Sequence, residues 1–321
     1  MVFKRLLGAI GVGAPSVDTV LEGGAVLPGG TLGGRVLLRG GSAAADIEQI
    51  TLELVARVEA EGGDGEHEGT VSFGRFPVGG AFRLGEEEAH EVPFSLVLPW
   101  ETPITELHGQ SLGLPLGVRT ELAVAGARDA GDLDPLAVRP LPVQEAVLEA
   151  FGQLGFAFTS ADLELGHIPG TGQQLPFYQE IELAPGPQFA HAMQEVEVTF
   201  LASPGGMEVV LEADKRGGMF SAGHDALARF TVSHHDVAQA DWTALVDSWV
   251  KQLAEHRGAP PGSYGHGGHH HGEDHGRRGP GMGTVAVAAA GGLAAGVVGG
   301  MVAAEVVDEI GDAFEAEDEE E

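Results

Sequence analysis

Alternation of apolar and polar residues dominates the chain between Val17 and Ala213. The clearest run lies at residues 50–59, and its apolar positions are Ile50, Leu52, Leu54, Ala56 and Val58. A period of two is typical of a half-buried β-strand. Turns rich in glycine and proline separate such runs, as at residues 28–30. Short strands between turns, without a helical period, predict a β-sandwich.

The stretch at residues 117–141 joins the two halves of the chain. It opens as an alternating strand and then reaches three residues that break the pattern: Asp129, Asp132 and Asp134. Pro135 biases the residue before it towards an extended conformation. We therefore predict an acidic interdomain connector between a first domain at 1–130 and a second domain at 131–257. The spacing of the aspartates does not match the helix-loop-helix calcium loop, which disfavours a calcium site.

Two helices are predicted within the second half, at 143–154 and after Asp241. The second helix has an apolar stripe at helical spacing: Trp242, Leu245, Val246, Trp249, Val250 and Leu253. Asp241 is suited to its N-cap. We interpret it as a helix that closes the second sandwich. A partner-binding helix is the alternative, because the stripe holds two of the three tryptophans.

Residues 258–282 are a low-complexity linker, which we expect to be disordered. Its glycine-rich sequence carries five clustered histidines: His266, His269, His270, His271 and His275. Neutral imidazoles bind nickel, copper or zinc, so this tract is the candidate metal site and raises a metal-handling role as one alternative function.

Residues 283–310 form an apolar segment of alanine, glycine and valine, and an acidic tail follows at 311–321. Gly292, Gly296 and Gly300 lie on one helical face, which allows close helix association. The composition is a weak membrane-insertion signal. We therefore place homo-oligomerisation or peripheral membrane contact ahead of a transmembrane anchor. A membrane-associated or self-assembling protein is the other alternative function.

Composition narrows the classes of partner and chemistry. The 321 residues carry 17 basic and 48 acidic side chains, a net charge of −31, which opposes contact with nucleic acid. The absence of cysteine excludes disulfides and thiolate chemistry and is typical of a cytoplasmic protein. No nucleophile elbow, HExxH motif or phosphate loop is present, so we expect no enzyme activity, no catalytic residues and no cofactor. We interpret the N-terminal residues 1–15 as a short amphipathic helix rather than a signal peptide.

Several motifs occur in a characteristic order: FKRLLGAIGVGAPSVDT at 3–19, LPWETPIT at 98–105, TEL at 120–122, LGF at 154–156, DLE at 162–164 and LPFYQEIE at 175–182. This combination resembles the bacterial sporulation-control protein family (SpoOM). The resemblance implies an all-β fold of two arrestin-like β-sandwich domains in tandem, here followed by the C-terminal amphipathic helix and the low-complexity tail. It further implies a non-enzymatic regulator or scaffold of cell development, which acts on protein partners in the cytoplasm and brings no catalytic residues.

Overall fold

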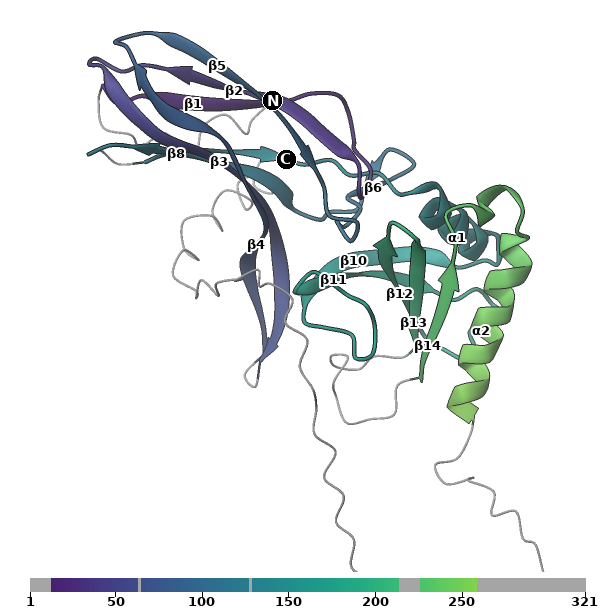
Figure 1. Cartoon of the computed structure of the whole chain (residues 1–321). Helices are drawn as coiled ribbons and strands as arrows, with labels where there is room; N and C mark the ends of the chain where they lie inside the picture. Colours follow the sequence, from purple (N-terminus) through teal and green to yellow (C-terminus); the bar gives the residue numbers. More distant parts are fainter. Residues whose placement is uncertain (1–12, 63–64, 127–128, 214–225, 259–321) are drawn as a thin grey trace, which may run out of the picture. The chain divides into compact units, whose positions relative to one another are not determined.

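The computed structural model describes residues 13–62, 65–126, 129–213 and 226–258 (Figure 1). The histidine tract, the glycine face and the proposed N-terminal helix lie outside these residues, so they remain predictions. Among the helices of the described residues, none combines the length and the apolar composition that a bilayer crossing requires.

A three-stranded antiparallel sheet lies in the first half of the chain, with the order β1 (Ser16–Leu21), β2 (Thr31–Arg39) and β5 (Ala89–Val97). Apolar side chains of β2 and β5 share a core with strands of a second, larger sheet. Strand β5 stops at Val97, directly before the segment that contains Pro99. A small hairpin of β6 (Glu106–Leu107) and β7 (Gln110–Ser111) follows.

The larger sheet has nine strands and runs through both halves of the chain. Its order is β14 (Ala226–Val232), β13 (Gly206–Ala213), β12 (Val196–Ser203), β11 (Phe177–Ala184), β10 (Ala157–Leu165), β3 (Ala45–Gly62), β8 (Leu116–Val124) and β9 (Ala130–Pro135), with β4 (Gly65–Leu84) paired to β3. One parallel pair, Glu164 with Glu59, joins β10 to β3. The long hairpin of β3 and β4 therefore reaches past β8 to the strands of the second half (Figure 1).

Strand β3 is buried on both faces in its middle, whereas its alternation predicted a half-buried strand. The positions between the apolar residues were predicted to be exposed. Three of them are buried instead: Thr51 is 3% exposed, Glu53 2% and Val55 0%. The prediction is wrong for this face because Arg75 of β4 and Arg119 of β8 lie over the Glu53 carboxylate and pair with it.

The segment after β8 also differs from the irregular connector that the sequence predicted. Asp132 and Asp134 lie within β9, which pairs antiparallel with β8, and Asp129 directly precedes that strand. The Asp132 carboxylate accepts a hydrogen bond from the backbone N–H of Thr19 in β1, at 2.7 Å. This long-range contact and the pairing with β8 hold an aspartate-rich segment in a strand.

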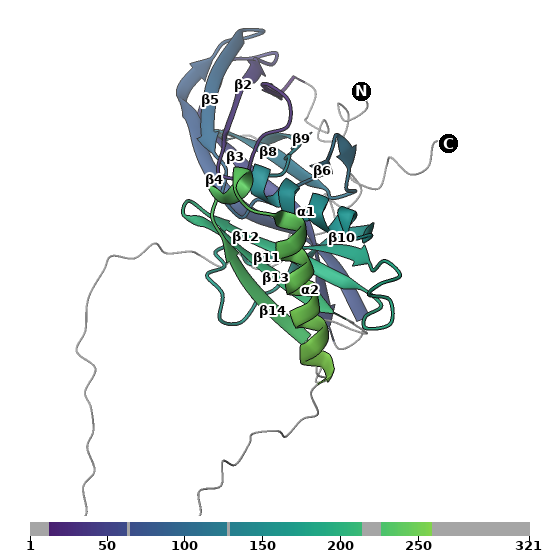
Figure 2. The same ribbon diagram turned by 90° about the vertical axis from the view of Figure 1, so that its right-hand side faces the viewer.

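Two helices cover one face of the strands of the second half (Figure 2). Helix α2 (Trp242–Gly258) buries four residues of its predicted stripe: Val246, Trp249, Val250 and Leu253. Trp249 stacks on Phe230 of β14, with ring centroids 4.7 Å apart. The N-cap prediction is confirmed, since the Asp241 carboxylate accepts the N–H of Ala244 at 3.1 Å. The closing helix and the all-β fold class are confirmed.

Helix α1 (Pro142–Gln153) confirms the other predicted helix. Pro142 stands at its first turn, where a missing N–H costs nothing. The Gln144 side chain accepts the N–H of Leu141 at 2.8 Å. The short 3-10 helix η1 (Asp236–Ala238) leads into α2 and lies against α1. The N-terminal part of α2 therefore meets the exposed side of α1.

Candidate functional site

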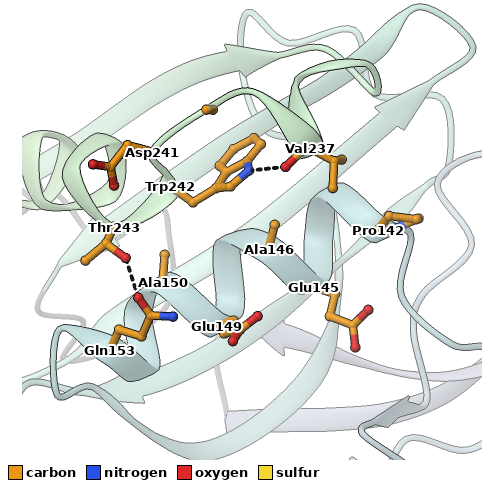
Figure 3. A pocket seen from close by; sticks show the side chains of 11 residues that line it. Pro142, Glu145, Ala146, Glu149, Ala150, Gln153, Val237, Asp241, Trp242 and Thr243 are labelled. Carbon is orange, nitrogen blue, oxygen red and sulfur yellow. Dashed lines mark hydrogen bonds between the residues drawn. The ribbon is translucent and has the colours of Figure 1, made fainter.

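A cleft of about 440 Å³ opens between α1 and the start of α2 (Figure 3). One wall comes from α1, where Ala146 and Ala150 are spaced four residues apart and therefore share a helix face. The other wall comes from η1 and the first turn of α2. Because alanine side chains are small, the α1 wall leaves room below the ring of Trp242 (Figure 3).

Trp242 is held in a defined orientation in this cleft. Its indole N–H donates a hydrogen bond to the backbone oxygen of Val237, at 3.2 Å (Figure 3). The neighbouring Thr243 hydroxyl donates to the side-chain oxygen of Gln153, which ties the end of α1 to the start of α2. The aromatic ring is thus positioned before any ligand arrives.

Among the residues that the structure describes, the lining of the cleft carries only negative formal charges. Glu145, Glu149 and Asp241 belong to it, and no lysine, arginine or histidine does. Glu145 also lies 3.3 Å from the imidazole Nδ1 of His108, outside the lining. Asp241 uses one carboxylate oxygen to cap α2. The site can therefore attract a cation to a fixed aromatic ring.

A second cleft of about 300 Å³ adjoins the first at Glu145 and Pro142, which line both. Leu27, Arg139 and His108 are among its other lining residues. The guanidinium of Arg139 gives this second cleft a mixed charge. Of these two adjoining clefts, the one over α1 is therefore the one whose described lining is acidic without a basic side chain.

Carboxylates also gather on the sheet, at the junction of β10 and β11. Asp162, Glu164 and Glu180 each offer one oxygen, and these oxygens lie within 4.8 Å of one another. Within the described residues they form the grouping that could hold a metal ion, and hard cations such as calcium prefer such oxygens. Burial first, and then the charges of the nearby Glu180, Glu182, Glu164 and Glu59, together raise the pKa of the Asp162 carboxyl from 3.8 to about 8.

The register of the strands explains why these acids meet. Asp162 of β10 pairs directly with Glu180 of β11. A neighbouring row across the sheet consists of Ser160, Glu182, Glu197 and Glu212. Burial, followed by the charges of the same carboxylates, also raises the pKa of the Tyr178 hydroxyl, which therefore stays protonated at neutral pH.

Replacing Asp162 with asparagine is expected to flatten the pH dependence of stability. The folded state holds the Asp162 proton more tightly than the unfolded chain, so its stabilisation is full below about pH 4 and is lost as the pH rises to about 8. The variant lacks this loss. Its free energy of unfolding should exceed that of the wild type by about 1–2 kcal/mol at about pH 9, a value reduced for the partial exposure of the side chain.

Urea denaturation at a series of pH values measures this difference. Glu48→Gln, which neutralises an exposed acid, serves as the control and should follow the wild-type profile. Parallel pH profiles for Asp162→Asn and the wild type would show that the carboxyl titrates normally.

Two of the three aspartates singled out in the sequence accept hydrogen bonds from backbone groups. Asp132 accepts the N–H of Thr19, and Asp129 accepts the N–H of Val124 at 3.3 Å. The metal-capable grouping of the described residues does not include them. Sequence reasoning missed both the carboxylate group of β10 and β11 and the cleft. A cluster of acids on adjacent predicted strands was the available signal for the first.

The fold and its cleft define an all-β protein with a pair of helices packed on one face of its large sheet. A family model described as SpoOM protein matches residues 3–217. The sporulation-control protein spo0M of Bacillus subtilis (strain 168) is 38% identical over 215 residues, which are 67% of this chain and 81% of that protein. The chain belongs to the SpoOM family.

The structural comparison agrees with this assignment. The crystal structure of Spo0M, sporulation control protein, from Bacillus subtilis matches with a TM-score of 0.68 and 32% identity, over 75% of this chain and 100% of that chain. The arrestin-like fold that the sequence motifs implied is therefore confirmed. The family model ends at residue 217, so the α1 wall of the cleft lies within the matched region and α2 lies beyond it.

Proposed function

We propose that this protein is a non-enzymatic regulatory or scaffold protein of bacterial sporulation or development, and that it acts through contacts with a partner protein. Membership of the SpoOM family supports the regulatory role, since the relative in Bacillus subtilis is named a sporulation-control protein. The family assignment covers most of the sheet structure and helix α1.

The observation that carries the partner-based mechanism is the cleft between α1 and α2. It is open to solvent along α1, it is about 440 Å³ in volume, and it holds a tryptophan fixed by a hydrogen bond. Tryptophan is strongly enriched among the residues that dominate binding at protein interfaces. A preoriented ring also loses little conformational freedom on binding.

Filling the cleft should impair function in the cell without unfolding the protein. Ala146→Trp places a large side chain in the space below Trp242. In the native bacterium, a strain that lacks the gene and expresses this variant should form at least about tenfold fewer spores or developed cells than one expressing the wild type. Melting temperatures of the purified proteins should agree.

Glu86→Trp is the matched control, because it adds the same side chain at an exposed turn between β4 and β5. It should complement fully. Full complementation by Ala146→Trp would exclude the cleft as the contact surface. A substrate turnover that a single substitution abolishes without loss of fold would contradict the non-enzymatic role.

A further inference from the structure

We propose that the cleft between α1 and α2 docks a basic segment of a partner protein, with an arginine side chain placed over the ring of Trp242. This inference rests on the proposed function, which requires a partner protein, and it names the chemistry of that partner. Three observations support it: the charge of the lining, the geometry of the aromatic ring and the change of charge at one end of the cleft.

The charge of the lining selects a cationic partner. Three acids line the cleft, namely Glu145, Glu149 and Asp241, and no basic residue is among the lining side chains that the structure describes. The net charge of −31 extends the same preference over longer range and favours encounter with basic segments. A second copy of this chain is disfavoured, because a symmetric contact through this face would bring the same three carboxylates of each copy together.

The geometry of the ring favours arginine over lysine. The bond from the Trp242 indole to Val237 holds the ring across the cleft, and Ala146 leaves the space beside it open (Figure 3). A guanidinium group is planar and stacks on an indole face, and it can also form two parallel hydrogen bonds with one carboxylate. The Glu149 carboxylate is exposed along the same wall and is suited to that second role.

The change of charge at the Pro142 end gives the bound segment a direction. Beyond Glu145 the surface continues into the cleft that contains Arg139, which repels a cation. The basic segment therefore lies along α1 from Glu145 towards Gln153. Helix α1 has 12 residues and spans about 18 Å. An extended peptide of about five residues covers that length.

Binding of a labelled peptide of arginine and alanine to the full chain tests this inference. The test variant carries Glu145→Gln, Glu149→Gln and Asp241→Asn, and asparagine retains the capping ability of position 241. The charge-matched control carries Glu48→Gln, Glu86→Gln and Glu255→Gln, three exposed acids outside the cleft. Fluorescence anisotropy at near-physiological salt should show binding weakened about tenfold or more in the test variant and less than about threefold in the control.

Nuclear magnetic resonance supplies a second readout. The indole N–H signal of Trp242, assigned with Trp242→Phe, should shift more on titration than those of Trp100 and Trp249. A peptide with citrulline in place of arginine keeps the shape and loses the charge, and it should bind at least about tenfold more weakly.

Equal weakening in the test variant and the charge-matched control would overturn the inference, because attraction would then come from the overall charge. An unmoved Trp242 signal, or equal binding of the citrulline peptide, would overturn it as well. An equal Trp242 shift with spermidine would assign the cleft to a small polyamine instead of a protein segment. If the arginine peptide does not bind while Ala146→Trp impairs function in cells, only the basic chemistry of the partner is refuted. Full function of Ala146→Trp in cells would refute the proposed function separately.

Discussion

Replacing Arg119 with alanine is expected to lower the free energy of unfolding by about 3–5 kcal/mol, the cost of breaking a buried ion pair from one side. The Glu53 side chain is 3% exposed, and Arg119 donates from both Nε and Nη2 to its carboxylate. After the change, Glu53 keeps only Arg75, whose side chain is 62% exposed. Guanidinium denaturation of both proteins measures the difference.

Arg83→Ala is the control, because Arg83 and Asp46 form an ion pair in which both side chains are more than half exposed. Exposed pairs contribute about 0–1 kcal/mol, so the control should unfold close to the wild type. The double variant Glu53→Met, Arg119→Met should regain much of the lost stability, since no buried carboxylate remains. A loss below about 1 kcal/mol for Arg119→Ala would mean that water reaches Glu53.

Replacing Gln179 with leucine is expected to destabilise the protein by about 2–6 kcal/mol, because two buried backbone groups lose their partner at about 1–3 kcal/mol each. The Gln179 side chain accepts the N–H of Ile104 and donates to its oxygen, both at 2.9 Å. Ile104 is fully buried. This pair of bonds links β11 to the segment after β5, 75 positions away in the chain.

Gln188→Leu provides the comparison, because the Gln188 amide also donates to a backbone oxygen, that of Leu154, but at an exposed position. Water can replace that bond, so denaturation midpoints should stay close to the wild type. If Gln179→Leu and Gln188→Leu lose equal stability, the Ile104 groups find other partners after the change.

Local patterns identified the elements whose partners lie nearby in the chain. The apolar stripe of α2 and its Asp241 cap depend on residues within a single helix, and both were predicted. The hairpin of β12 and β13 is local in the same sense, since Ser203 pairs with Gly206. The family motifs also predicted the fold class.

Interactions between distant residues decided what local patterns missed. Asp132 lies in a strand because its backbone pairs with β8 and its carboxylate accepts the N–H of Thr19 in β1, which is 113 positions away. Glu53 is buried because Arg119, 66 positions away, neutralises it. The local composition disfavours a strand at Asp132 and predicts exposure of Glu53. In both cases the tertiary contact offsets that preference.

The candidate site depends on the tertiary structure even more strongly. The sequence by itself determined that α2 is amphipathic and carries Trp242, and that a helix lies at residues 143–154. It did not determine that the two helices meet, since Thr243 and Gln153 are 90 positions apart. Amphipathicity specifies which face of a helix is buried but not which neighbour covers the rest. Only the packing of α1 and α2 on one sheet brought the carboxylates to the tryptophan.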